Sequence, residues 1–286
     1  MRRFTTASLA LTIAATGVFA GAAAVLAQDD ESLKIGLVTD VGQLEDKSFN
    51  EFTYAGMLDA AEALGAETDV IITEEVADYQ ANMQAFVDEG FQIIVTPGSL
   101  IGTATAEMAK ANPDVFFVGI DQDTASEETP NFQGVQFRED QAGYLVGIVA
   151  ASITESDIIG AVAGTNLPAV VRFVDGYING ARSVNPDIEV LTREASPQPE
   201  IGFNTPDLGS EIAGQMLDLG ADVLFQIAGG TGVGVLEAAC SADAYGIGVD
   251  VDQALSLPAA AAECVVTSAE KKLQDTVNAV IQSTQD

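Results

Sequence analysis

The chain has 286 residues, of which 11 are Lys or Arg and 43 are Asp or Glu, giving a formal net charge of −32. This length predicts one large or two medium domains, and a hydrophobic content of 48% allows a sizeable core. So acidic a surface repels phosphate backbones and anionic lipid, which excludes nucleic acid as an expected partner. The absence of His excludes imidazole catalysis and His-ligated metal, and two Cys cannot form a four-sulfur zinc site.

Residues 1–27 are predicted to be a cleavable export signal. Arg2 and Arg3 form a basic start, an Ala- and Leu-rich stretch follows, and small residues stand just before Gln28, where cleavage is expected. The apolar run is nearly long enough for a membrane anchor, which is the alternative, but its Ala and Gly content favours cleavage. We therefore expect a secreted, periplasmic or cell-surface protein. No Cys lies near the cleavage site to carry a lipid.

Apolar runs typical of strands alternate with helical segments from residue 34 onward. A first series has expected strands at 34–38, 70–72, 93–95 and 115–118 and helices at 48–64, 79–88 and 101–110. A second has helices at 141–152, 170–184, 208–219 and 233–239 and strands at 158–162, 188–191, 223–225 and 245–249, and residues 267–271 are expected to open a last helix. This alternation predicts an α/β fold of two doubly wound, Rossmann-like domains with a ligand cleft between them.

Export also bears on the two cysteines. Cys240 and Cys264 are expected to form a disulfide in an oxidising compartment. Closing that loop would stabilise the fold by about 3 kcal/mol in the chain-entropy description. The alternative is a pair of buried thiols.

Ligands of such folds bind beyond the carboxyl ends of the strands, so residues there are candidate site residues. Asp40 follows the first strand, and Ser48 and Glu51 have capping-box spacing, which places Phe49 and Asn50 in the first helical turn. Together Asp40, Phe49 and Asn50 offer an acceptor, a stacking face and an amide, a set suited to a planar ligand with polar edges. Purely local roles, as core staple and hydrogen-bonding partner, are the alternative.

Further candidates follow later strands. Asp121 ends one strand, Phe203 precedes a helix with Pro at its first position, and Asp250 and Asp252 end another strand. The three carboxylates are as well explained as loop caps. Lys271 is one of few cations outside the signal, and beside Asp side chains it is suited to donate to a ligand hydroxyl, although a solvated Lys is the alternative.

A glycine-rich segment at residues 228–234 joins a strand to a helix. It lacks both the spacing of a dinucleotide fingerprint and the Lys of a P-loop, so it indicates only close backbone approach. No cofactor and no metal are expected.

These motifs come together in an order that resembles the basic membrane protein family, the PnrA-like substrate-binding proteins of ABC transporters, many of which bind purine nucleosides. The resemblance covers about residues 33–283 and rests on Asp40-x-Gly42, Asp46-x-Ser48-Phe49-Asn50, Val170/Phe173/Gly176, Asn185-Pro186-Asp187, residues 228–234, Gly248-Val-Asp250-x-Asp252-Gln253 and Thr267-Ser268-x-x-Lys271. It implies a periplasmic-binding-protein type I fold that closes on its ligand and delivers it to a membrane permease. The implied domains are 33–137 plus 252–286, and 138–251.

The resemblance also implies a role for each site residue. Phe49 resembles the aromatic residue that stacks on the base, and Asp40, Asn50 and Asp121 resemble the groups that read the base edge. Phe203 is the candidate for the opposing aromatic residue, with Phe173 as the alternative. Asp250 and Lys271 resemble the pair that binds the ribose diol. Gly229 and Gly230 would let the backbone approach the sugar.

The sequence departs from the family in three ways. Many members are lipoproteins and this chain lacks the lipid-bearing Cys, its charge is acidic rather than basic, and members normally continue with a further crossover and strands, so we expect this chain to be a fragment.

Three other functions are alternatives to a nucleoside-binding protein. A sugar-binding protein of the same fold is the main alternative, because an aromatic ring with several Asp also suits a pyranose. A nucleoside-processing enzyme is disfavoured, because the acids come from separate strands and no cofactor fingerprint is complete. A repressor is disfavoured by the export signal and the negative charge. We expect a binding protein and not an enzyme.

Overall fold

The computed structural model describes residues 32–123 and 129–285. The predicted export signal at residues 1–27 lies outside this part. Within it, no helix combines the length and the apolar composition that crossing a membrane requires.

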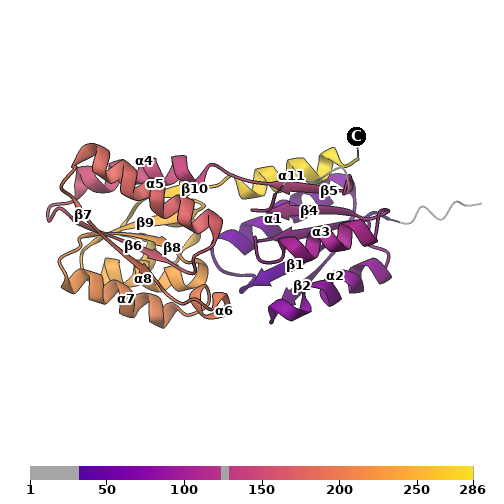
Figure 1. The fold of residues 1–286 in the computed structure, drawn as a ribbon, viewed down its shortest axis with the longest axis horizontal. Helices are drawn as coiled ribbons and strands as arrows, with labels where there is room; N and C mark the ends of the chain where they lie inside the picture. The colour runs from indigo at the N-terminus through magenta and orange to yellow at the C-terminus, as the bar shows by residue number, and fades with distance from the viewer. Residues whose placement is uncertain (1–31, 124–128, 286) are drawn as a thin grey trace, which may run out of the picture. The chain divides into compact units, whose positions relative to one another are not determined.

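The first of two parallel sheets has the strand order β2-β1-β3-β4-β5 (Figure 1). Its strands are β1 (Lys34–Val41), β2 (Glu67–Thr73), β3 (Ile93–Pro97), β4 (Phe116–Ile120) and β5 (Phe132–Val135). The helices of this first lobe are α1 (Phe49–Leu64), the short 3-10 turn η1 (Val76–Asp78), α2 (Tyr79–Asp88), α3 (Gly102–Ala111) and, from the far end of the sequence, α11 (Leu273–Ser283). The apolar runs of β1, β3 and β4 are buried because helices cover both faces of the sheet.

Alternate residues of β1 show how the two faces are covered. Ile35 and Leu37 pack in one cluster with Met57 of α1 and Val277 of α11. Val38 points to the other face and packs with residues of α2 and α3, such as Met83. Figure 1 shows α1 with α11 on one side of the sheet and α2 on the other.

The second sheet has the strand order β10-β9-β8-β6-β7, which is the order of the first sheet read from its other edge. Its strands are β6 (Ile158–Ala163), β7 (Glu189–Glu194), β8 (Val223–Ile227), β9 (Tyr245–Asp250) and β10 (Val265–Glu270). The helices of this second lobe are α4 (Glu139–Ile153), α5 (Pro168–Val184), α6 (Pro199–Gly202), α7 (Pro206–Asp218), α8 (Gly229–Ser241), α9 (Gln253–Ser256) and α10 (Ala259–Ala262). Helices α4 and α5 cover one face, and α7 and α8 the other (Figure 1). The predicted α/β class with two doubly wound domains is confirmed.

Glycines bring α4 and α5 unusually close. A Cβ added to Gly143 would lie 2.3 Å from the Phe173 carbonyl oxygen, and one added to Gly147 would lie 2.2 Å from that of Tyr177. Any larger side chain at these positions would push the two helices apart, so the glycines set how closely α4 and α5 pack.

Two strands differ from the sequence-based expectation. β5 is short and contains Gly134, so it lacks the apolar run that marks the other strands. Residues 267–271 were expected to open a helix, but residues 265–270 form β10, which pairs in parallel with β9 from Val265 to Glu270. The β-branched residues Val265, Val266 and Thr267 favour a strand, and the last helix begins only at Leu273. Of the segment 252–286, therefore, β10 adds to the second sheet while α11 packs against α1 in the first lobe.

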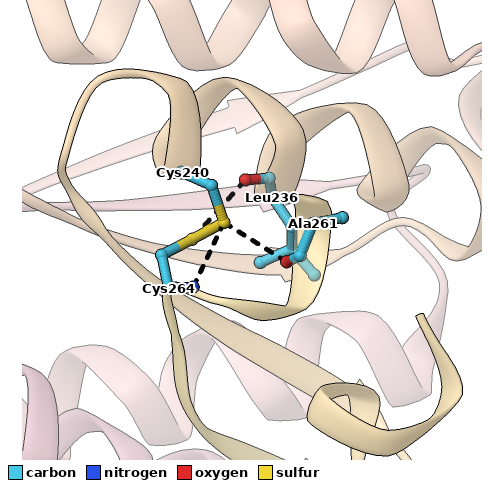
Figure 2. Close-up of a disulfide and its surroundings, with 4 residues drawn as sticks. All are labelled: Leu236, Cys240, Ala261 and Cys264. Atoms are coloured by element: carbon cyan, nitrogen blue, oxygen red, sulfur yellow. Dashed lines mark hydrogen bonds between the residues drawn. A yellow bond between two sulfur atoms is a disulfide. The ribbon is translucent and has the colours of Figure 1, made fainter. Parts of the chain in front are cut away.

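The predicted disulfide between Cys240 and Cys264 is present (Figure 2). It joins the last turn of α8 to the turn before β10, with the two Cα atoms 5.1 Å apart. The Cys264 backbone N–H also donates to Cys240 Sγ at 3.3 Å. The covalent loop encloses all of β9 and α9, so it restrains the segment that carries Asp250.

Replacing both cysteines by Ser should lower the free energy of unfolding by about 3 kcal/mol, because the unfolded chain regains the freedom that the closed loop removes. Urea unfolding of the wild type and the double variant measures this difference. Thiol labelling of unfolded, unreduced protein is the control, and two free thiols per chain would contradict the disulfide.

Candidate functional site

A pocket with about 760 Å³ of empty space, including the part open to solvent, lies where the strand ends of both sheets meet. Of the nine ligand-binding residues predicted from the sequence, the eight that line it are Asp40, Phe49, Asn50, Asp121, Phe203, Gly229, Asp250 and Lys271. Gly230 is not among the lining residues, and the alternative aromatic Phe173 is.

The first turn of α1 presents Phe49 and Asn50 to the pocket, but Ser48 does not cap it as expected. The Asp46 carboxylate takes that role and accepts from the backbone N–H groups of Ser48, Asn50 and Glu51 at 2.9 to 3.2 Å. A carboxylate with two oxygens can satisfy three orphan donors of a helix N-terminus, which a single hydroxyl cannot. The Asn50 Nδ2 amide donates to the Gln43 carbonyl at 3.2 Å, and its buried Oδ1 has no partner among the described residues.

Ser48, freed from capping, links the two lobes. Its hydroxyl donates to Asp250 Oδ2 at 2.9 Å, at the end of β9 in the second lobe. Two further contacts join the same segment to the second lobe: Gln43 N–H donates to Asn204 Oδ1 at 3.1 Å, and Ser256 Oγ donates to the Lys47 carbonyl at 3.1 Å. The turn before α1 is therefore both a wall of the pocket and a contact between lobes.

Asp40 is buried at the end of β1 and is held by a partner that the sequence did not reveal. The Tyr79 hydroxyl, from the start of α2, donates to Asp40 Oδ1, and so does the Val41 backbone N–H at 2.7 Å. Burial raises the pKa of Asp40 to about 6, although these hydrogen bonds oppose the change. No local pattern marks Tyr79 as a site residue, because it reaches Asp40 only when the fold brings the start of α2 next to the end of β1.

Lys271, just after β10, is the charged centre of the site. Its Nζ lies 2.6 Å from Asp121 Oδ2 of the first lobe, 3.3 Å from Glu139 Oε1 and 3.9 Å from Asp250 Oδ1 of the second lobe. Burial lowers the pKa of Lys271, but the Asp121, Asp250 and Glu139 carboxylates outweigh it and raise that pKa overall. The ammonium is therefore a cation at neutral pH, with its side chain only 3% exposed.

The carboxylates around Lys271 are themselves perturbed. Burial raises the pKa of Asp250 to about 6 against the opposing charge of Lys271, and it raises the pKa of Asp121 as well. Asp121 Oδ1 has no hydrogen-bond partner among the described residues. Both strand-end acids have left-handed backbone, with φ of 61° at Asp121 and 65° at Asp250. Such backbone is uncommon outside Gly, and it is concentrated at functional sites.

Glu139 and Arg172 are charged residues beside the site that the sequence did not indicate. Glu139 begins α4, its side chain is fully buried, and Arg172 Nε donates to its Oε2 at 2.7 Å. An acid in the first turn of a helix is usually solvated, so nothing local distinguishes Glu139 from its neighbour Asp140, whose side chain is 47% exposed.

Aromatic rings surround the same cation. Lys271 Nζ lies 5.1 Å from the ring centroid of Phe49 and 5.4 Å from those of Phe137 and Phe173. Phe173 is 1% exposed and packs in the core of the second lobe. Its ring centroid lies 6.1 Å from that of Phe225, in an edge-on arrangement. Phe203 is half-buried and its ring packs against Gly164, where an added Cβ would come within 2.3 Å of it.

Sequence comparison finds a family that matches nearly all of the chain from residue 33 onward. The family described as ABC transporter substrate-binding protein PnrA-like matches residues 33–285. The ABC transporter nucleoside-binding protein BmpA of Lactococcus lactis subsp. cremoris is 29% identical over 88% of this chain and 75% of its own length. The CD4+ T-cell-stimulating antigen of Listeria innocua is 32% identical over 87% of this chain and 73% of its own length.

Solved structures agree with this match. A solute-binding protein of an ABC transporter system from Aeropyrum pernix is 28% identical and superimposes with a TM-score of 0.80, covering 88% of this chain and 70% of that one. A second such protein, from Conexibacter woesei, is 26% identical with a TM-score of 0.67, covering 89% and 81%. The chain therefore belongs to the PnrA-like family of ABC transporter substrate-binding proteins.

Proposed function

We propose that the chain binds a purine nucleoside in the pocket between its lobes and delivers it to the membrane permease of an importer. The observation that carries this proposal is the combination, in one pocket, of aromatic rings, a Lys–Asp cluster and acceptors that have no partner among the described residues.

The base would stack on Phe49. Phe203 is the better candidate for the opposite side, because it is half-buried while Phe173 is committed to the core of the second lobe. At the base edge, Asn50 Oδ1 is available as an acceptor, because the Nδ2 group of the same side chain already donates to the Gln43 carbonyl. Asp40 adds carboxylate oxygens, so this edge favours a base that presents N–H donors.

The sugar would meet the cluster around Lys271. An ammonium has three N–H donors, and Asp121 accepts one at 2.6 Å, which leaves donors for a ligand hydroxyl. Asp250, 3.9 Å from Nζ, would accept from the same diol. A vicinal diol, which both donates and accepts, matches this pair.

The charge of the site argues against a phosphorylated ligand. Three buried carboxylates, Asp121, Glu139 and Asp250, face one buried ammonium and the partly exposed Arg172. A phosphate would add negative charge to this excess, so the proposed ligand is a nucleoside and not a nucleotide.

Guanosine or adenosine should raise the unfolding free energy of the protein by about 4 kcal/mol at a thousandfold excess over the dissociation constant. Ribose, glucose and the 5′-monophosphates should raise it little, because they lack the base or add charge. A thermal-shift panel measures this. A sugar as effective as guanosine would replace the proposal with the sugar-binding alternative.

Phe49→Ala and Lys271→Ala should each weaken nucleoside binding, but for different reasons. Loss of the stacking face should reduce affinity by about 1–3 kcal/mol for a nucleoside and for its 2′,3′-dideoxy analogue alike. Loss of the ammonium should cost about 1.5–3 kcal/mol for the nucleoside only, because the analogue lacks the diol. Calorimetry with both ligands decides this. Equal losses on Lys271→Ala would remove Lys271 from the sugar subsite.

Affinity should fall as the pH drops below 6. A ligand that donates to Asp40 and Asp250 prefers their ionised forms, so it lowers their pKa from the value of about 6 in the free protein. Binding is therefore strongest above pH 6, and it should weaken by up to about tenfold per pH unit below it for each proton taken up. Calorimetry from pH 5 to 8 tests this, and a flat profile would show that neither acid accepts from the ligand.

The same raised pKa values act on folding in the opposite direction. The ordinary pKa of an Asp is 3.8, so the folded protein holds these two protons more tightly than the unfolded chain. Their burial thus lowers folding stability as the pH rises from about 4 through 6. Replacing Asp40 by Asn removes one such group. Without ligand, the folding stability of the Asp40→Asn variant relative to the wild type should therefore rise as the pH increases from about 4 to 6.

A further inference from the structure

Glu139 is a buried acid that the proposed ligand contacts do not use. It is not among the residues that line the pocket, yet its side chain is 0% exposed. A glutamate is almost never buried so completely unless its charge is paired. Its two oxygens meet different cations: Oε2 accepts from Arg172 Nε at 2.7 Å, and Oε1 lies 3.3 Å from Lys271 Nζ.

Glu139 and Lys271 also stand at two crossings of the chain between the lobes. Residues 136–138 lead from β5 in the first lobe to α4 in the second, and residues 271–272 lead from β10 in the second lobe back to α11 in the first. The 3.3 Å ion pair therefore ties one crossing to the other. Arg172 lies on α5, which glycine contacts hold against α4.

The position of the ammonium depends on charges on more than one side. Asp121 and Asp250 line the pocket, whereas Glu139 does not, so Glu139 attracts Lys271 from outside the ligand space. Without that attraction the ammonium would be drawn wholly towards the pocket carboxylates, and their oxygens would no longer be open to a ligand.

We propose that Glu139 is a positioning residue for ligand recognition. By holding Lys271 between the two crossings, it keeps the ammonium donors and the Asp250 oxygens available to the hydroxyls of the ligand. This inference rests on the proposed nucleoside function and adds to it a residue that never touches the ligand.

Glutamine cannot replace Glu139 in this role. A carboxylate offers one oxygen to Arg172 and one to Lys271, whereas an amide offers one oxygen and turns its NH₂ towards the other cation. Glu139→Gln therefore tests the contact with almost no change in volume. Asp140→Asn is the matched control, because it removes an acid from the same first turn whose side chain is 47% exposed and forms its ion pair with Arg138, at 3.1 Å.

In calorimetry, Glu139→Gln should bind a purine nucleoside at least tenfold more weakly than the wild type and its 2′,3′-dideoxy analogue less than threefold more weakly. In a Lys271→Met background, Glu139→Gln should cause no further loss. Asp140→Asn should leave both affinities unchanged. Equal weakening of both ligands would show a merely structural role and overturn the inference, as would unchanged nucleoside binding.

A measurement without ligand separates this inference from the proposed function. In protein labelled with ¹⁵N-lysine, the Lys271 ammonium signal, assigned by its loss in Lys271→Met, should exchange with water slowly in the wild type. It should exchange at least fivefold faster in Glu139→Gln and not in Asp140→Asn. Unchanged exchange in Glu139→Gln overturns the positioning role even if nucleosides bind. Faster exchange in a protein that binds no nucleoside supports that role and overturns the proposed function.

Should Glu139→Gln fail to fold, Glu139→Asp gives the same test. It keeps the charge and both oxygens but is one methylene shorter, so it cannot span Arg172 and Lys271 together. A nucleoside loss of three- to tenfold with an unchanged dideoxy affinity supports the inference, and equal losses overturn it.

Discussion

The site depends on one buried ammonium, that of Lys271, in a chain with a net charge of −32. Taking an ion out of water costs several kcal/mol, and only well-placed partners offset it. Lys271 has such partners in both lobes: Asp121 in the first, Glu139 and Asp250 in the second. The carboxylates depend on it equally, because without Lys271 three buried acids would lie close together, with the partly exposed Arg172 paired to one of them. The cluster holds together only when strands from both sheets meet, so the charge pairing and the pocket form together.

Hydrogen bonds at the turn before α1 extend this coupling to the part of the pocket that Asn50 lines. Asp46 fixes the backbone of Ser48, Asn50 and Glu51, which aims the Asn50 side chain at the pocket. The same turn contacts the second lobe through Ser48 and Asp250. A ligand bound to Asn50 and Asp250 would touch two groups that this turn already connects. Such a ligand would stabilise the arrangement in which the lobes meet. The size of this stabilisation equals the difference between its binding free energies for that arrangement and for others.

The sequence revealed the parts of this architecture that depend on local patterns. Continuous apolar runs identified most strands, and the topology of parallel sheets then placed Asp40, Asp121 and Asp250 at the same edges. Partners that meet only in three dimensions could not be found this way. Glu139 looks like any first-turn acid, and Tyr79 like any aromatic residue at a helix start, until the fold brings them to Lys271 and Asp40. The spacing of Ser48 to Glu51 predicts a cap at Ser48, but the Asp46 carboxylate, two residues earlier, accepts from the backbone donors of this turn instead.

The two lobes present Asp121 and Asp250 in the same way, but the residues beside these two acids differ. In each sheet the fourth strand along the chain ends in a Gly-x-Asp triplet, residues 119–121 and 248–250, with left-handed backbone at the Asp. In each a glutamine packs on that Gly: an added Cβ would lie 2.3 Å from Gln122 Oε1 in one and 2.9 Å from Gln253 Oε1 in the other. The fifth strands break the likeness, because β10 leads to Lys271 and β5 to Gln136. A single ammonium, carried after the fifth strand of one sheet only, thus lies beside two equivalent acids, 2.6 Å from Asp121 and 3.9 Å from Asp250.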